Sequence, residues 1–259
     1  MLVIDAMEAT LSIDLLYKTI DPYALVGKKE ELFDRMKQIP NLGITDSTTI
    51  HSQGVLGWIA MDEAEGGTAL NVSQKMAAEI GRKLSKRVVV FSTGAEVIAG
   101  QIVDTNHPTI KSALTAEGYS VTLGPALKDD RDYIAGMIRQ AIDQDGYRLV
   151  ITTGGVGAEA KDHSIEALKQ VDPDAATPYI CKFEKGHGRH LKDGIRIGVG
   201  KRDGSTIVVL PGPNDEVRVS LPIVVKCLEE REGTHTMAEK LARNLRDILR
   251  RKMQHRHHQ

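Results

Sequence analysis

Residues 152–168 read TTGGVGAEAKDHSIEAL, and this stretch places a glycine-rich turn between a strand-like run and a helical pattern. The apolar run 147–152 precedes the turn, and a helix is predicted from about Ser164. Glycines let backbone N–H groups surround an anion, and the N-terminus of the following helix favours a phosphate. The same turn also suits a tight strand-to-helix connection with Asp162 or Ser164 as the N-cap. This stretch alone supports both interpretations equally.

Strand and helix signals alternate on either side of this turn. Apolar runs at 88–91, 119–123 and 147–152 are separated by helical patterns that begin near Pro108 and Asp130. Strands joined by helices form parallel sheets, and ligands bind beyond the carboxyl ends of such strands. The sequence therefore predicts an α/β fold with a mostly parallel sheet.

The remainder of the α/β region adds a hairpin and a helix. Strands are predicted at 194–199 and 206–210, around a turn at 201–204. A helix follows at 214–230, and Pro222 introduces a local kink in it.

Three parts of the chain are predicted. Residues 1–86 contain several turns and a helical stretch at 71–86, and they predict a small N-terminal α+β module of unknown role. Its acidic stretch 62–67 is interpreted as a solvated loop in preference to a ligand or cation site. Residues 87–230 form the α/β domain, and residues 231–259 predict a basic amphipathic helix.

Composition narrows the class of protein. The 259 residues carry a formal charge of −1, which does not favour a nucleic-acid partner. The two cysteines have no partners at ligand spacing, so neither a zinc site nor a disulfide framework is predicted. Apolar runs are shorter than the roughly 18 residues that a membrane span needs. A cytoplasmic protein that binds neither membrane nor nucleic acid is expected.

Two further polar stretches follow strands of the predicted sheet. Residues 92–106, STGAEVIAGQIVDTN, offer hydroxyl, amide and carboxylate groups to a polar heterocycle or its phosphate, although Thr105 or Asn106 also suits the N-cap of the next helix. Residues 127–130, LKDD, place two carboxylates at the same edge. With Asp162 they would hold Mg²⁺ against phosphates, but helix capping by Asp130 is the favoured interpretation from spacing alone.

These stretches together resemble the MoaB/Mog-like molybdopterin-binding domain. STGAEVIAGQIVDTN, LKDD, TTGGVG with Asp162 and Ser164, and LPGPNDE at 210–216 occur in the order of that family. The family includes molybdopterin adenylyltransferases, molybdenum-insertion enzymes and the amino-terminal part of CinA-like proteins. The resemblance implies a three-layer α/β/α fold and a homo-oligomer, with a trimer favoured.

The resemblance also implies a site and its ligands. Asp129 and Asp162 correspond to catalytic carboxylates that hold Mg²⁺ and position ATP against a pterin phosphate. Molybdopterin is the implied ligand. The residues expected to bind it or its phosphate are Ser92, Thr93, Gly94, Asp104, Asn106, Thr153, Gly154, Gly155, Gly157, Ser164, Pro211 and Gly212.

The chain departs from the family pattern at three places. Ala95 stands where an acidic residue is usual, AEAK at 158–161 replaces a small, proline-containing segment, and LKDGIRIGVG replaces the usual asparagine and Ala-Pro-Gly block. Lys161 could pair with a phosphate instead of making a loop contact. The basic stretch 182–190, KFEKGHGRH, adds a candidate anion-binding lid, whereas His187 and His190 are expected to be solvated.

The resemblance therefore implies a molybdopterin-binding protein of molybdenum cofactor biosynthesis, with adenylation by ATP and Mg²⁺ as its catalytic form. Two alternatives stay open. GQIVDTN is closer to the CinA-like branch, which implies a metal-dependent pyrophosphatase that cleaves ADP-ribose. A non-catalytic protein that binds a pterin or nucleotide is the third, with residues 1–86 in contact with a partner protein.

Overall fold

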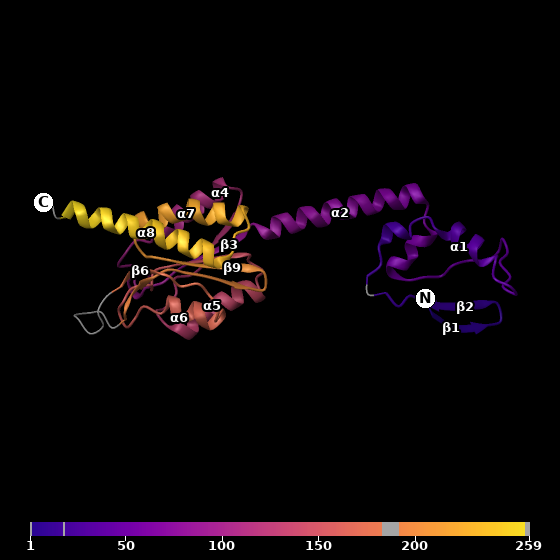
Figure 1. Cartoon of the computed structure of the whole chain (residues 1–259), viewed down its shortest axis with the longest axis horizontal. Coiled ribbons are helices and arrows are strands. Elements are labelled where there is room, and N and C mark those ends of the chain that lie inside the picture. The colour runs from indigo at the N-terminus through magenta and orange to yellow at the C-terminus, as the bar shows by residue number, and fades with distance from the viewer. Residues whose placement is uncertain (1, 18, 183–191, 257–259) are drawn as a thin grey trace. The chain divides into compact units, whose positions relative to one another are not determined.

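The computed structural model describes residues 2–17, 19–182 and 192–256. Contacts along the chain divide it into two units, residues 1–80 and 81–259, and Figure 1 labels several elements of each. The predicted lid at 182–190, with His187 and His190, lies outside the described residues except for Lys182.

The first unit is a small α+β assembly. Three apolar side chains, Val26, Phe33 and Leu70, are buried in it. Its elements are β1 (Leu2–Met7), β2 (Thr10–Asp14), the 3-10 helices η1 (Pro22–Ala24) and η2 (Gly54–Ala60), α1 (Lys29–Met36) and most of α2 (Glu63–Ser85). The two strands pair as an antiparallel hairpin.

The prediction that 62–67 forms a loop is wrong, because α2 begins at Glu63. Asp62 caps this helix by accepting hydrogen bonds from the backbone N–H groups of Ala64 and Glu65 at 2.9 and 3.0 Å. A β-carbon on Gly66 would lie 2.8 Å from Val26 Cγ1. Glycine at position 66 therefore permits the close approach of Val26 to α2, although the composition of residues 62–67 suggested a turn.

The second unit is built on a five-stranded sheet with the order β4-β3-β5-β9-β8. Its first four strands are parallel, and β8 is antiparallel to β9, which confirms the predicted mostly parallel sheet. The strands are β3 (Arg87–Ser92), β4 (Ser120–Leu123), β5 (Leu149–Thr153), β8 (Gly198–Arg202) and β9 (Ser205–Leu210), and β6 (Tyr179–Lys182) pairs separately with β7 (Gly194–Arg196). The helices are α3 (Ala95–Ile98), α4 (Asn106–Ala116), α5 (Arg131–Asp143), α6 (Ser164–Val171), α7 (Asn214–Glu229) and α8 (Thr234–Arg256).

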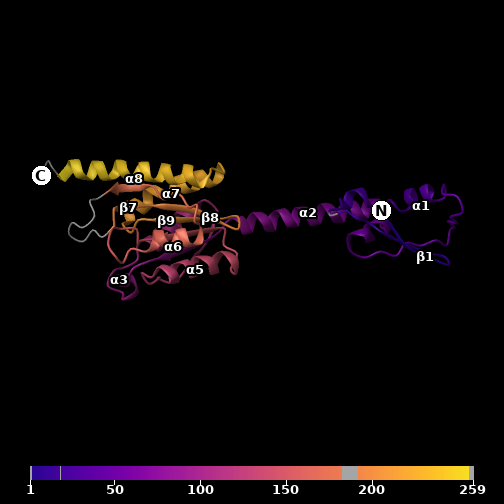
Figure 2. The ribbon, with the colours of Figure 1, turned by 60° about the horizontal axis from the view of Figure 1, so that its bottom comes forward.

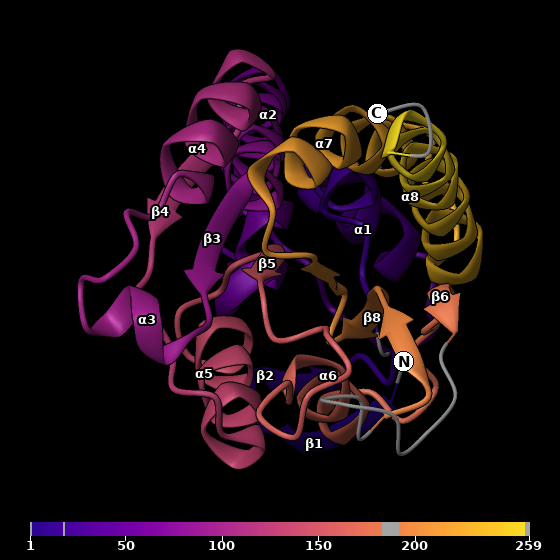
Figure 3. The ribbon, with the colours of Figure 1, turned by 90° about the vertical axis from the view of Figure 1, so that its left-hand side faces the viewer.

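Helices cover both faces of this sheet, as Figures 2 and 3 show. Because successive strand side chains point to opposite faces, Val88 and Val90 join the core beneath α4, α7 and α8. Val89 and Phe91 join the second core, beneath α5 and α6. The unit is therefore a three-layer α/β/α fold, as expected.

The predicted strand 194–199 is wrong as a single element. It divides at the fully buried Ile197 into β7, which pairs with β6, and β8, which pairs with β9. A β-carbon on Gly198 would collide with Leu168 of α6, so glycine permits the close approach of β8 to that helix. The hairpin turn is shorter than predicted: Asp203 and Gly204 both have positive φ, at 45° and 75°.

Helix α8 belongs to the core of the second unit. Met237, Leu241 and Leu245 are at most 2% exposed and lie in the same apolar cluster as residues of α4 and α7. Within the described residues, no helix combines the length and apolar character that a membrane crossing requires.

Candidate functional site

Four loops meet at the carboxyl edge of the parallel strands. The N–H of Thr93, after β3, donates to Thr153 O at 2.9 Å, and the N–H of Gly154, after β5, donates to Leu210 O at 3.0 Å. The loop after β4 joins them, since the N–H of Gly94 donates to Leu127 O at 3.3 Å. The sheet order thus brings the polar stretches of the sequence together, although they are far apart along the chain.

The glycine turn is shaped by side chains that fill the space beside it. Gly154 and Gly155 have φ of 90° and 63°, and a β-carbon on Gly155 would collide with Ser164 Oγ. Ser164 is fully buried, and its hydroxyl donates to Gly154 O at 2.9 Å. Thr93 Oγ1 would lie 2.9 Å from a β-carbon on Gly154. Glycines are therefore required at these positions, and the buried Ser164 hydroxyl stabilises the turn through its hydrogen bond to Gly154.

Asp162 and Gly157 form the far side of the same turn. Asp162 Oδ2 accepts a hydrogen bond from the N–H of Glu159 at 2.8 Å, and it would lie 2.5 Å from a β-carbon on Gly157. The N-cap position of α6 is His163, which makes no capping hydrogen bond through its side chain. Neither Asp162 nor Ser164 is thus the N-cap that spacing suggested, because the Asp162 carboxylate accepts from Glu159 N–H and the Ser164 hydroxyl donates to Gly154 O.

Asp104 organises the loop after β3. Its Oδ1 accepts from the N–H groups of Asn106 and His107 at 2.9 and 3.1 Å, so it caps α4. Its Oδ2 accepts from Ser92 Oγ at 2.6 Å, and Ser92 Oγ also lies 3.2 Å from Thr153 Oγ1. The expectation that Thr105 or Asn106 supplies the cap is wrong, because Asp104 reaches the free N–H groups of the first turn.

Asn106 joins this loop to the one after β9. Its Nδ2 donates to Gly212 O at 2.7 Å, and its Oδ1 accepts from Asn214 Nδ2 at 3.0 Å. A β-carbon on Gly212 would lie 3.7 Å from Gly154 Cα, so the Pro211-Gly212 turn lies against the glycine turn. Asn214 was not singled out from the sequence, because its contacts are with residues more than 100 positions away.

Asp129, in the loop after β4, contacts the start of α3. Asp129 Oδ2 accepts from the N–H of Ala95 at 3.2 Å. Burial of the Asp129 carboxyl raises its pKa above the ordinary value; the Ala95 hydrogen bond and the charge of Lys161 oppose this rise, whereas the Glu96 and Asp162 carboxylates add to it. Asp130 is separate from this group, because it caps α5 through Tyr133 N at 2.8 Å, as its spacing predicted.

Glu96 supplies a carboxylate close to the position where Ala95 lacks one. Its Oε1 lies 2.8 Å from Lys161 Nζ, and this hydrogen bond lowers the pKa of Glu96. Lys161 therefore contacts a carboxylate of the loop after β3. This contact joins residues 65 positions apart, which is why spacing could not reveal it.

The donor set suits a cation that shares its coordination with phosphates. Asp129 and Asp162 each accept one backbone N–H through Oδ2, and Asp129 is partly buried. Mg²⁺ commonly binds one or two carboxylates together with phosphate oxygens. Within the described ranges, no group of three or more His, Cys, Asp or Glu side chains is placed to hold a metal by itself.

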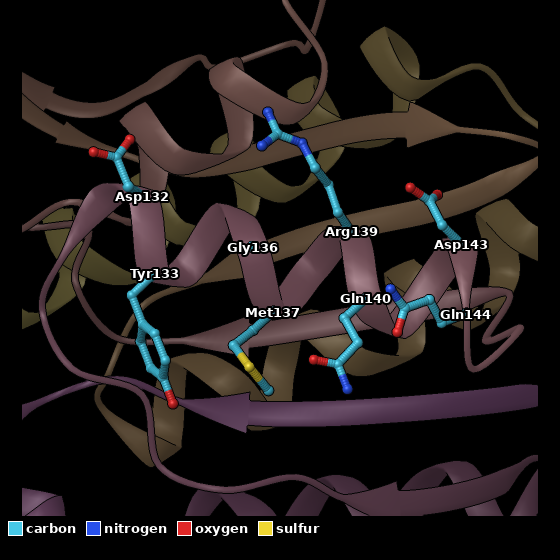
Figure 4. A pocket seen from close by; sticks show the side chains of 8 residues that line it. All are labelled: Asp132, Tyr133, Gly136, Met137, Arg139, Gln140, Asp143 and Gln144. Atoms are coloured by element: carbon cyan, nitrogen blue, oxygen red, sulfur yellow. The ribbon is translucent and has the colours of Figure 1, made fainter.

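An open hollow on α5 is unrelated to this edge. Figure 4 shows that its side chains come from α5, among them Tyr133, Met137 and Gln140, and from Gln144, which directly follows this helix. None of the candidate site residues lines it. The polar edge of the sheet, where four loops converge, is therefore the better candidate site.

The chain is similar in sequence and in fold to several known proteins. A CinA-like protein of Thermomicrobium roseum is 31% identical over 159 residues, which cover 51% of this chain and 38% of that protein. This chain thus spans less than half the length of that relative. Similar solved structures include CinA of Thermoplasma acidophilum, with a TM-score of 0.45, 21% identity and coverage of 55% of this chain and 98% of that one. Another is the molybdopterin biosynthesis enzyme MoaB of Thermus thermophilus, with a TM-score of 0.45, 23% identity and coverage of 55% and 91%.

A family model matches residues 89–230, which is more than half of the chain and includes all four loops of the site. Its description is "Probable molybdopterin binding domain". The chain therefore belongs to this molybdopterin-binding-domain family.

Proposed function

We propose that the chain binds molybdopterin at the carboxyl edge of its sheet and acts in molybdenum cofactor biosynthesis. The observation that carries the proposal is the glycine turn at 154–157, which lies beside the start of α6 and is packed closely against Thr93, Ser164 and Asp162. Backbone N–H groups and the positive end of a helix dipole favour a phosphate at such a turn. The pterin would lie along the polar loop after β3.

The catalytic form of the proposal is adenylation of the bound pterin. A phosphate oxygen of molybdopterin would attack the α-phosphorus of ATP, a new P–O bond would form, and pyrophosphate would leave. Asp129 and Asp162 would hold Mg²⁺, which supplies positive charge to the phosphates. The glycine turn would keep the pterin phosphate in line with ATP, and no covalent protein intermediate is needed.

Incubation of the protein with molybdopterin, ATP and Mg²⁺ tests both forms. We expect saturable binding of the pterin, followed by adenylated product and pyrophosphate. Asp162→Asn should reduce turnover more than it reduces pterin binding. Binding without product in the wild-type protein would remove the catalytic form, and absence of pterin binding would overturn the proposal as a whole.

The similarity to a CinA-like protein supports a second candidate function. In that case the same edge would bind ADP-ribose, and metal-dependent attack of water would release AMP and ribose 5-phosphate. Liquid chromatography of a reaction containing ADP-ribose and Mg²⁺ distinguishes this activity from adenylation. A third form, in which the chain is a non-catalytic carrier, predicts tight binding of a pterin or nucleotide and no product in either assay.

The assembly and location proposed for this protein are a homotrimer and the cytoplasm. The resemblance of its motifs to the MoaB/Mog-like family supports the trimer, and the composition supports the location. Native mass spectrometry of the purified protein would report the subunit number together with any pterin or nucleotide that copurifies.

A further inference from the structure

A lysine crosses between two loops of the candidate site. Lys161 Nζ lies 2.8 Å from Glu96 Oε1 and 3.8 Å from Glu159 Oε2. Lys161 belongs to the loop after β5, whereas Glu96 lies in α3, after β3. The Lys161 and Glu96 side chains are 50% and 41% exposed, so the surrounding water screens their attraction. Their contact can therefore open when a stronger partner arrives.

The surroundings of this lysine are acidic. The hydrogen bond to Glu96 is the largest cause of the raised pKa of Lys161, and the charges of Glu159 and Asp129 contribute further. Asp162, one residue away in the sequence, adds another carboxylate beside the glycine turn. A phosphate that enters this edge meets several negative charges, so a lysine ammonium group beside it would favour its binding.

One of the two partners is held more firmly than the other. The N–H of Ala95 donates to Asp129 Oδ2 at 3.2 Å, which fixes the start of the short helix that carries Glu96. The ammonium group of Lys161 lies at the end of a long, flexible side chain with several rotatable bonds. The ammonium group can therefore leave Glu96 without a change of the backbone at Glu96.

We propose that Lys161 is a movable counter-ion, which Glu96 holds in the unliganded protein and which transfers to the ligand's phosphate on binding. This inference rests on the proposed phosphate-binding function of the same edge. It makes Lys161 a binding residue and Glu96 a positioning residue, which competes with the phosphate for the lysine. The affinity for phosphate then depends on how tightly Glu96 holds Lys161, as well as on the glycine turn.

A double-mutant cycle tests this transfer. Molybdopterin and its dephosphorylated form are titrated calorimetrically into four proteins: the wild type, Glu96→Gln, Lys161→Gln and the double variant. Lys161→Gln should weaken binding of molybdopterin about tenfold, and Glu96→Gln should tighten it about threefold. The dephosphorylated pterin should bind all four proteins equally. In the Lys161→Gln background, Glu96→Gln should have no further effect.

The cycle separates the transfer from simple removal of negative charge. If Glu96→Gln tightens binding equally with and without Lys161, Glu96 acts by repulsion and the proposed competition is overturned. Equal weakening of both pterins by Lys161→Gln would overturn the phosphate contact.

A second titration, with inorganic phosphate, keeps the test independent of the pterin. The amide signals of Gly154, Gly155 and Gly157 are followed by NMR in the same four proteins. We expect the same order of affinities, with Glu96→Gln tightest. Equal phosphate affinity in all four would overturn the counter-ion proposal. Failure of the wild-type protein to bind molybdopterin, with this order preserved, would instead overturn the proposed pterin function.

Discussion

Gly155 has no room for a side chain, and its φ of 63° lies in the left-handed region. Gly155→Ala should therefore destabilise the protein by about 1–3 kcal/mol through strain and collision with Ser164 Oγ. It should also weaken ligand binding, since the turn must move. Urea denaturation measures the first effect and pterin titration the second.

Gly136→Ala is the matched control. Gly136 lies within α5, and nothing is within 4 Å of the position that its β-carbon would occupy. Alanine is a better helix former than glycine, so this substitution should stabilise the protein by roughly 0.5–1 kcal/mol. A stabilising effect of both substitutions would show that the glycine turn is not constrained as described.

Asp129 should give the stability of the protein a distinct pH dependence. Its pKa is raised in the folded protein, chiefly by burial, so folding favours its protonated form. Its contribution is fully present below the ordinary Asp pKa of about 4, and it is lost as the pH rises through the raised value. Relative to Asp129→Asn, the wild-type protein should therefore lose stability across this window.

Denaturation of both proteins at a series of pH values measures this difference, and NMR titration of the Asp129 carboxyl gives its pKa directly. A wild-type protein that gains stability relative to Asp129→Asn as the pH rises would indicate a lowered pKa. That result would contradict the burial of this carboxyl.

Single side chains show where sequence reasoning reached its limit. Capping by Asp130 was predicted correctly, since the cap and the N–H that it accepts lie three residues apart. Serine and aspartate are also common N-cap residues, but the Ser164 hydroxyl bonds to Gly154 and the Asp162 carboxylate packs beside Gly157. The pairing of Lys161 with Glu96 depends on the order of strands in the sheet, which local spacing does not contain.

Helix α4 depends on a cap that lies two residues before it begins. Asp104→Ala removes the acceptor for the N–H groups of Asn106 and His107 and for Ser92 Oγ. We expect a loss of about 1–2 kcal/mol in the free energy of unfolding. Thr105 makes no capping hydrogen bond through its side chain, so Thr105→Ala should change stability by less than about 0.5 kcal/mol. Chemical denaturation measures both changes. Equal losses in the free energy of unfolding for Asp104→Ala and Thr105→Ala would contradict the assignment of Asp104 as the cap.

Strands that are buried on both faces were the easiest elements to predict. β5 and β9 are buried at every position, and their continuous apolar runs indicate central parallel strands. The segment 194–199 was harder to predict, because its apolar pattern does not indicate which strands it pairs with. Tertiary contacts divide it between two sheets at Ile197.

Removal of residues 1–80 and removal of residues 231–259 should have different effects on the stability of the α/β unit. Residues 81–259 include both apolar cores of the sheet, whereas residues 1–80 have a separate small core. A protein of residues 81–259 should therefore fold and bind molybdopterin with the affinity of the full chain. Removal of residues 231–259 should instead unfold the unit, because Met237, Leu241 and Leu245 are buried in one of its cores.

Circular dichroism melting and pterin titration of the two truncated proteins test this contrast. More than a tenfold loss of affinity in residues 81–259, with the fold retained, would show that the first unit contributes to the site. A cooperative melt near that of the full chain after removal of residues 231–259 would show that α8 is dispensable to the core. Because the expected outcomes are opposite, a general intolerance to truncation cannot produce them both.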